Sequence, residues 1–295
     1  MYMTFRKNRL TLIIILIIIT AVILGYLADG RNNIEPTSNK IGVAVSIGPE
    51  VEFVKAVGGD KVDVTLMVPA TADVHTYEPL PSQLSKVAHA RMYVAVGSSI
   101  EFENNYLDKL RASNPSMLVV NASEGIQLIP NTAENGGTMD PHIWLSPRNA
   151  KIMVNNIYQG LVRVDPENQA YYQMNRDHYL EKLNELDKNT KEQLKGRTKP
   201  ILIYHPAFAY YARDYNLTMI GVMTSDEEPS PQRMAMMVDT ARENGIKVVY
   251  LEPQYDPKFM NALASQIGGQ VILVSDLNES YLNNMKNIAI AFSKA

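Results

Sequence analysis

Three histidines and one aspartate are the residues of this sequence best suited to carry chemistry. His75 lies in the segment VHTYEP, His142 in DPHIW, His205 in YHPAF and Asp276 in VSDL. Each histidine stands within four residues of a proline and near an aromatic residue. Together the four side chains could supply three nitrogens and one oxygen, which is a tetrahedral donor set for a metal ion.

The donor types limit which metal such a site holds and how it uses that metal. Imidazole suits zinc, copper, iron and nickel, whereas manganese and magnesium sites depend more on carboxylates. The chain has no cysteine, which excludes thiolate ligands, a disulfide scaffold and a cysteine nucleophile. Four protein ligands close the coordination shell of zinc, whereas a catalytic zinc keeps a position for water. The set therefore indicates a protein that holds a metal ion rather than one that uses it on a substrate.

The loop around His142 has a composition that restricts its motion. The segment TMDPHIWLSP contains the only tryptophan of the chain, Trp144, and a proline on each side of the histidine, Pro141 and Pro147. Proline restricts the backbone, and Trp144 can pack as an apolar anchor that keeps the site dry. A ligand fixed in advance loses less entropy on binding, so we expect a preorganised loop.

The neighbours of these candidates are less informative. Histidines that bind a metal usually give their second ring N–H to a carboxylate or carbonyl group. Asp140 and Glu78 are close enough in sequence to the first two candidates to serve, with a solvent-facing role as the alternative for each. His89 lies at a turn from a helix to a strand, and His178 lies among charged residues on an expected helix, so we assign neither a functional role.

Eight short apolar segments are typical of β-strands, and helical patterns lie between them. The strand candidates are residues 41–46, 62–68, 92–97, 117–122, 201–205, 218–223, 247–252 and 270–276. Near-continuous apolar strands that alternate with helices indicate parallel sheets covered on both faces. The four candidate ligands lie at or beyond the carboxyl ends of such strands, where open parallel sheets bind ligands. Two come from each half of the chain, so the four can meet between the halves.

A charged segment separates the two sets of strands. Asp165 and Pro166 suit an N-cap and a first helical position. Residues 167–195 contain no glycine and no proline, and we expect one amphipathic helix of about 45 Å, with two helices and a break as the alternative. The sequence thus predicts an α/β protein with two (β/α)4-type lobes, whose parallel sheets are joined by one long rigid helix.

The amino terminus differs from the rest of the chain. Residues 10–28 are uncharged and apolar, and their length is close to the roughly 20 residues that span a bilayer as a helix. Basic residues precede this stretch and Asp29 follows it, which favours an amino end in the cytoplasm and export of the remainder. A cleaved signal peptide is the alternative. The expected segments are a signal anchor or signal peptide at 1–29, a tether at 30–40, lobes at 41–164 and 199–295, and the linking helix at 165–198.

Four segments together resemble the zinc- and manganese-specific solute-binding proteins of ABC transporters. They are HTYEPLPSQLSKV, DPHIWLSPRNA, YHPAFAYYARDYNL and SDEEPSPQRM, and the resemblance covers about residues 40–295. It implies two α/β lobes bridged by a long helix, with the metal between the lobes. The metal ligands of the family match His75, His142, His205 and Asp276.

Some departures from the family pattern bear on the metal and on the anchor. Family members with glutamate as third ligand are mostly associated with manganese, so His205 favours zinc. Many dedicated zinc members carry a long histidine-rich loop where this chain has the short NTAENGGT, which leaves manganese or mixed specificity open. Val74 stands where the family often has an acid or a proline, which removes one extra oxygen ligand. Many relatives are lipoproteins anchored through a cysteine, so here the apolar segment is the expected anchor.

We therefore expect an extracytoplasmic metal-binding protein, not an enzyme, that captures Zn²⁺ or Mn²⁺ and delivers it to an ABC permease. We expect a monomer at the outer face of the cell membrane or in a periplasm-like space, attached through its N-terminal segment. The net charge of −3 gives no basic footprint for nucleic acid. The alternatives are a zinc-dependent hydrolase that uses the three histidines with Asp276 as base, and a surface adhesin with a metal site.

Overall fold

A computed structural model of the chain describes Thr20 and residues 40–131, 138–223 and 229–294. The chain divides into Met1–Asn39 and Lys40–Ala295, and the fold below is that of the second unit. The expected membrane or signal segment and the tether lie outside the described residues, apart from Thr20 and Lys40. Within the described ranges, no helix is both long and apolar enough to cross a membrane.

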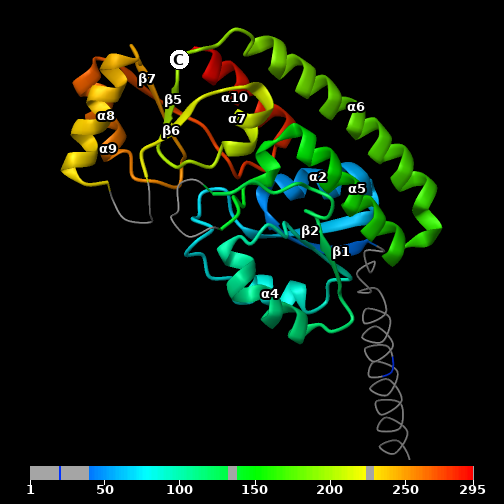
Figure 1. Cartoon of the computed structure of the whole chain (residues 1–295). Coiled ribbons are helices and arrows are strands. Elements are labelled where there is room, and N and C mark those ends of the chain that lie inside the picture. The colour runs from blue at the N-terminus through cyan, green and yellow to red at the C-terminus, as the bar shows by residue number, and fades with distance from the viewer. Residues whose placement is uncertain (1–19, 21–39, 132–137, 224–228, 295) are drawn as a thin grey trace, which may run out of the picture. The chain divides into compact units, whose positions relative to one another are not determined.

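The first lobe is built on a sheet of four parallel strands in the order β2-β1-β3-β4. The strands are β1 (Ile41–Ile47), β2 (Val62–Val68), β3 (Met92–Ala95) and β4 (Leu118–Asn121). One face packs against α2 (Gly48–Gly58) and α5 (Pro147–Val164), and the other against α3 (Pro81–Val87) and α4 (Glu101–Ser113) (Figure 1). Every residue of β3 is buried, as a strand with helices on both faces requires.

The second lobe repeats this plan with the parallel order β6-β5-β7-β8. Its strands are β5 (Ile201–Ile203), β6 (Met219–Gly221), β7 (Val248–Leu251) and β8 (Gln270–Leu273). One face packs against α8 (Pro231–Glu243) and α9 (Lys258–Ile267), and the other against α7 (Ala209–Tyr215) and α10 (Tyr281–Ser293) (Figure 1). All eight expected strands are present, and the expected fold class of two parallel α/β lobes is confirmed.

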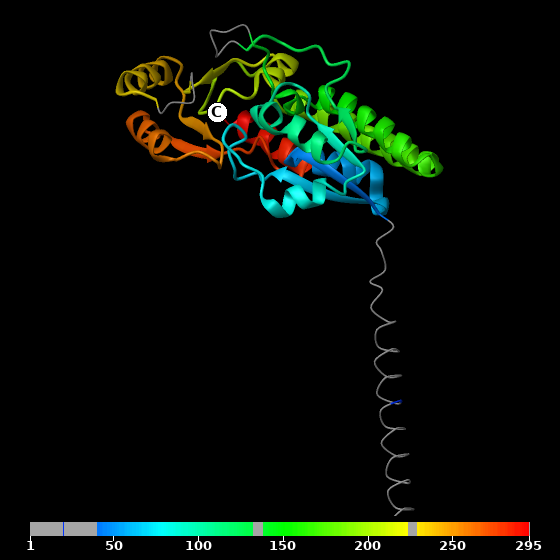
Figure 2. The ribbon, with the colours of Figure 1, turned by 90° about the horizontal axis from the view of Figure 1, so that it is seen from below.

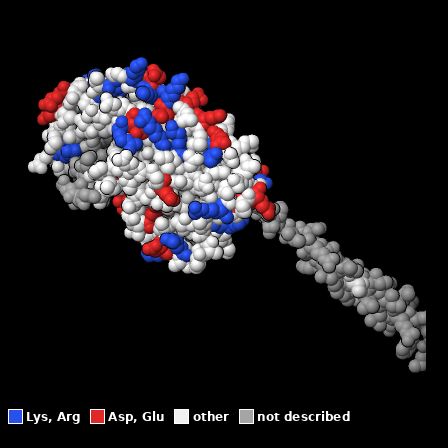
Figure 3. All heavy atoms as spheres, turned by 45° about the vertical axis from the view of Figure 1, so that its right-hand side comes forward, with Lys and Arg blue, Asp and Glu red and all other residues white. Residues whose placement is uncertain are grey.

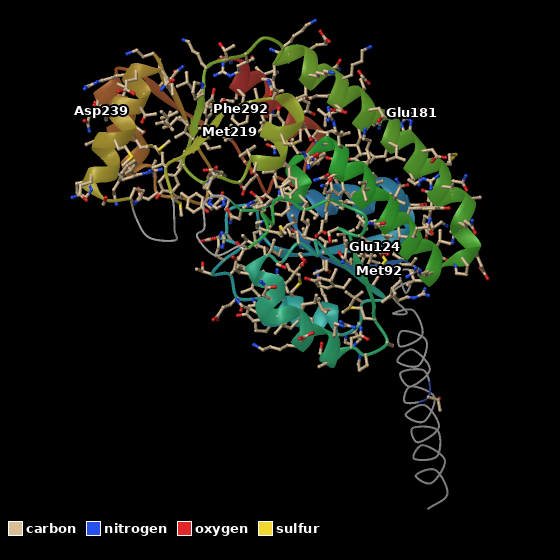
Figure 4. All side chains as sticks on the ribbon, viewed as in Figure 1. Met92, Glu124, Glu181, Met219, Asp239 and Phe292 are labelled. Carbon is tan, nitrogen blue, oxygen red and sulfur yellow. The ribbon has the colours of Figure 1, made fainter. Side chains whose placement is uncertain are left out.

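The apolar residues of the second lobe are divided between two cores. Leu202 belongs to a core beneath α8 and α9, whereas Ile201 and Ile203 belong to the core on the other face, because successive side chains of a strand point to opposite faces. The latter core is continuous with that of the first lobe. Met92 and Phe292, one from each lobe, both belong to it and are fully buried (Figure 4).

The long helix α6 (Gln169–Gln193) runs along both lobes without a break (Figure 2). It begins after a 3-10 turn at Pro166–Asn168, so the expected single helix is confirmed and the two-helix alternative is wrong. It packs against α2 and α5 of the first lobe and against α10 of the second. Glu181 lies on its outer side (Figure 4), and charges of both signs are mixed over that side of the molecule (Figure 3).

Two carboxyl groups are buried where β1 and β3 end. Oε2 of Glu50 accepts hydrogen bonds from the backbone N–H groups of Ser46 and Ile47, at 3.0 and 3.2 Å. Oε1 of Glu103 accepts one from the backbone N–H of Val96 at 2.7 Å. Burial raises the pKa of both carboxyl groups, and the charge of Glu103 adds to the effect on Glu50. These two acids therefore bind protons more tightly in the folded chain than in the unfolded one.

The contribution of Glu50 and Glu103 to the stability of the fold should fall as pH rises, and Glu50→Gln should remove the share of Glu50. A raised carboxyl pKa adds stability below the unfolded value near 4.5, and this stability is lost as pH rises through the folded value. One pKa unit corresponds to about 1.4 kcal/mol and therefore to roughly 3–6 °C in Tm at this size. In calorimetry, the Tm at pH 8 minus the Tm at pH 5 should be more positive for Glu50→Gln than for the parent. The exposed Glu185→Gln should keep the parental difference, and equal differences in all three proteins would contradict the argument.

Candidate functional site

The four candidate residues lie in loops at the carboxyl ends of the strands. His75 follows β2, and His142 lies in the connection between β4 and α5. His205 follows β5, and Asp276 follows β8. The last three residues are buried, whereas the side chain of His75 is 16% exposed. Two candidates therefore come from each lobe.

The structure brings the three imidazole rings together. The ring centroids of His142 and His205 are 5.0 Å apart, and those of His75 and His205 are 5.8 Å apart. The Nε2 atoms of His142 and His205 are 3.1 Å apart, close to the roughly 3.3 Å between two nitrogens bound tetrahedrally to zinc at 2.0–2.1 Å. A third donor does not join this pair. Across the described ranges, no group of three histidine or acidic side chains is close enough together to hold a metal ion.

A carboxylate lies beside each histidine of the first lobe. Oδ1 of Asp140 accepts the backbone N–H of His142 at 2.9 Å and lies 3.0 Å from its ring Nδ1. This contact fits one of the two partners that the sequence suggests. The other, Glu78, is exposed, and the carboxylate beside His75 is Glu101, whose Oε2 lies 3.0 Å from Nδ1. Although burial raises the pKa of Glu101, its contact with His75 outweighs this and lowers the pKa overall.

The surroundings of His205 and Asp276 are different. Burial lowers the pKa of His205 well below its ordinary value, and His142 and His75 add to this, so the ring is neutral, the form that binds metal. Burial raises the pKa of Asp276, whereas the amide of Gln254 and the two neighbouring histidines lower it. Nε2 of Gln254 donates to Oδ1 of Asp276 at 3.1 Å. The pKa of Asp276 is raised overall, because the effect of burial is the largest.

Trp144 connects the loops that carry His142 and Asp276. Its indole is fully buried, and its ring centroid lies 5.3 Å from that of His142. The indole N–H donates to the backbone carbonyl of Asp276 at 2.8 Å, and the carbonyl of Trp144 accepts a hydrogen bond from Tyr281 at 2.9 Å. The tryptophan is thus an apolar anchor, as the sequence suggests, and also a polar link between the two lobes.

The two histidines without an assigned role have ordinary local contacts. His178 lies on α6 with a side chain 67% exposed, and its Nδ1 is 3.9 Å from a carboxylate oxygen of Glu181. His89 is exposed, and its Nδ1 lies 2.8 Å from the carbonyl of Ser85 one turn earlier. Both positions suit matched controls for substitutions at the site.

The chain has a close match among known protein families. Residues 43–295 match the family model described as ZnuA, zinc-uptake complex component A periplasmic. The chain belongs to the ZnuA family. Its relatives include the high-affinity zinc uptake system protein ZnuA of Bacillus subtilis, which is 31% identical over 84% of this chain and 82% of that protein.

Other members of this family differ in the metal that they are named for. The manganese ABC transporter substrate-binding lipoprotein PsaA of Streptococcus anginosus is 28% identical over 88% of this chain and 86% of its own length. Among solved structures, this chain is similar to a ZnuA deletion mutant crystallised with zinc bound. The two share 35% sequence identity and superpose with a TM-score of 0.82, over 87% of this chain and 98% of the mutant. The family is thus one of zinc and manganese ABC transporter substrate-binding proteins.

Proposed function

We propose that this protein is the substrate-binding component of a metal ABC transporter, and that it holds one Zn²⁺ or Mn²⁺ ion as cargo between its lobes. Its ligands are His75, His142, His205 and Asp276. The observation that carries the proposal is the 3.1 Å approach of two Nε2 atoms that belong to different lobes. Membership of the ZnuA family supports the same conclusion.

The remaining two ligands complete the shell by small side-chain movements. The His75 ring is close to that of His205, at 5.8 Å between centroids. The carboxyl of Asp276 is buried and accepts a hydrogen bond from Gln254. A cation offsets the cost of placing this carboxylate in a buried site. Rotation of these two side chains toward the His142–His205 pair then gives four ligands and no position for a substrate, as a carrier site requires.

Zinc is the metal that the donor set favours. Three imidazoles and one carboxylate are typical of zinc, whereas manganese sites contain more oxygen. Relatives of this chain are named for zinc and for manganese, so manganese is the competing cargo. We infer that zinc binds more tightly than manganese here.

We propose an extracytoplasmic location with attachment through residues 10–28. The uncharged apolar composition of that segment supports attachment, and relatives named lipoproteins of metal transporters support the location. The protein acts as a monomer that delivers its ion to a membrane permease, with lobes at 41–164 and 199–295 joined by 165–198. The hydrolase alternative receives no support, since the family is one of transporter components rather than enzymes. An adhesin role is compatible with metal transport, since the laminin-binding protein Lmb of Streptococcus agalactiae, 25% identical with a TM-score of 0.76, is described with both activities.

Metal analysis of the protein purified from its own source should find close to one equivalent of zinc per chain. Mass spectrometry of the eluted metal identifies the cargo without assuming it. Competition titration of the stripped protein should then show tighter binding of zinc than of manganese. Protein that carries neither metal and binds neither in titration would overturn the proposed function, whereas tighter binding of manganese would overturn only the assignment to zinc.

A further inference from the structure

Glu101 is the first residue of α4 and comes from a different element than His75, yet their side chains are in contact. Nδ1 of the imidazole lies 3.0 Å from Oε2 of the carboxylate. The side chain of Glu101 is 40% exposed as a whole, but Oε2 itself is screened from solvent. That oxygen is therefore turned away from water and toward the ring.

The start of α4 is held firmly enough to fix the carboxylate in space. Phe102 is 1% exposed, and its ring centroid lies 6.3 Å from that of Tyr77, two residues beyond His75. Both oxygens of the buried Glu103 accept backbone N–H groups, from Val96 at 2.7 Å and from Gly97 at 3.0 Å. Glu101 is thus followed by two anchored residues, and α4 contacts the loop of His75 at two adjacent points.

His75 depends on such a contact more than His142 does. Asp140 and His142 lie in the same short loop. Oδ1 of Asp140 accepts the backbone N–H of His142 and also contacts its ring Nδ1. The backbone N–H of His75 donates to Asp73 at 3.0 Å in the same way, but its ring Nδ1 contacts a carboxylate from another element. The ring nitrogen turns instead to Glu101 across the loop. A ring held at Nδ1 directs its Nε2 to the opposite side, and Nε2 of His75 is screened from solvent.

We propose that Glu101 is a positioning residue for metal capture: it accepts the Nδ1 proton of His75 and leaves Nε2 as the nitrogen with the lone pair that faces the ion. The role in metal capture rests on the proposed function, whereas the contact between Glu101 and His75 does not. It parallels the role of Asp140 at His142, because carboxylates that hold a ligating histidine fix both its tautomer and its orientation. The first lobe then offers two preoriented imidazoles before the metal arrives.

The test compares Glu101→Ala, Glu101→Gln and the control Glu78→Gln, the last at an exposed carboxylate three residues after His75. In the metal-free protein, nitrogen NMR of the His75 ring should show the proton on Nδ1 for the parent, for Glu78→Gln and for Glu101→Gln, whose amide oxygen still accepts. Glu101→Ala should show a mixture of tautomers. Zinc titration should show a loss of about 10–100-fold for Glu101→Ala, a smaller loss for Glu101→Gln, and parental affinity for Glu78→Gln.

Two results would overturn the proposal. One is a His75 ring that carries its proton on Nε2 in the parent protein. The other is a Glu101→Ala variant that matches Glu78→Gln in both tautomer and affinity. Melting curves of each variant confirm that it is folded. If the parent binds no zinc, the proposed function fails, while the tautomer measurement still decides whether Glu101 positions the ring.

Discussion

Replacing His142 by alanine should reduce zinc affinity by far more than the roughly 10–100-fold that is typical of residues behind a ligand. The substitution removes one of the two nitrogens that already lie 3.1 Å apart across the lobes. The remaining donors would have to hold the ion without the best-placed imidazole. Isothermal titration of the stripped protein measures the change directly, with a competing chelator for the parent.

The fold should survive this substitution, which makes the result interpretable. Asp140 still accepts the backbone N–H at position 142, so its buried carboxylate keeps a partner. The exposed His178→Ala is the matched control and should keep parental affinity. Unchanged zinc binding in His142→Ala would remove this histidine from the site.

Replacing Trp144 by alanine should lower the free energy of unfolding by about 3–5 kcal/mol, the usual cost of emptying a buried aromatic position. The indole is fully buried, and its N–H donates to the backbone carbonyl of Asp276. The variant therefore loses apolar contacts and leaves a buried carbonyl without its donor. It should also lose zinc affinity, because the loop of Asp276 is no longer tied to that of His142.

Trp144→Phe separates the two contributions. It keeps most of the apolar ring but lacks the N–H, so its main cost is the lost hydrogen bond, at about 1–3 kcal/mol, with a smaller cost from the reduced ring volume. Urea denaturation followed by circular dichroism measures both variants, since Trp144 is the only tryptophan and its fluorescence disappears with it. An alanine variant as stable as the parent would show that the indole does not join the lobes.

The parts of the structure that depend on local pattern could be predicted from the sequence. The eight strands follow apolar segments bounded by helical patterns, and the long helix α6 follows a segment without glycine or proline. The convergence of the three imidazoles follows from strand topology, because the carboxyl ends of parallel strands form one edge. Asp140 could be predicted as a partner because it lies two residues from His142.

The contacts that could not be predicted join residues far apart in the chain. Glu101 reaches His75 from the first turn of α4, and no periodicity or spacing marks that pairing. Sequence proximity suggests only Glu78, which has the solvent-facing position that was its alternative. The indole of Trp144 binds a backbone carbonyl, and every residue has one, so its acceptor has no signature in the sequence. Gln254, which donates to Asp276, was missed because an amide after a strand is common.

The shared apolar core has a consequence for how the protein responds to heat. Ile203 and Phe292 of the second lobe are packed in the same cluster as Met92 of the first. Neither half can open without exposing apolar surface of the other, which is the condition for cooperative, all-or-none behaviour. The two lobes should therefore melt in one transition, and a substitution that loosens one of them should lower the melting temperature of the whole.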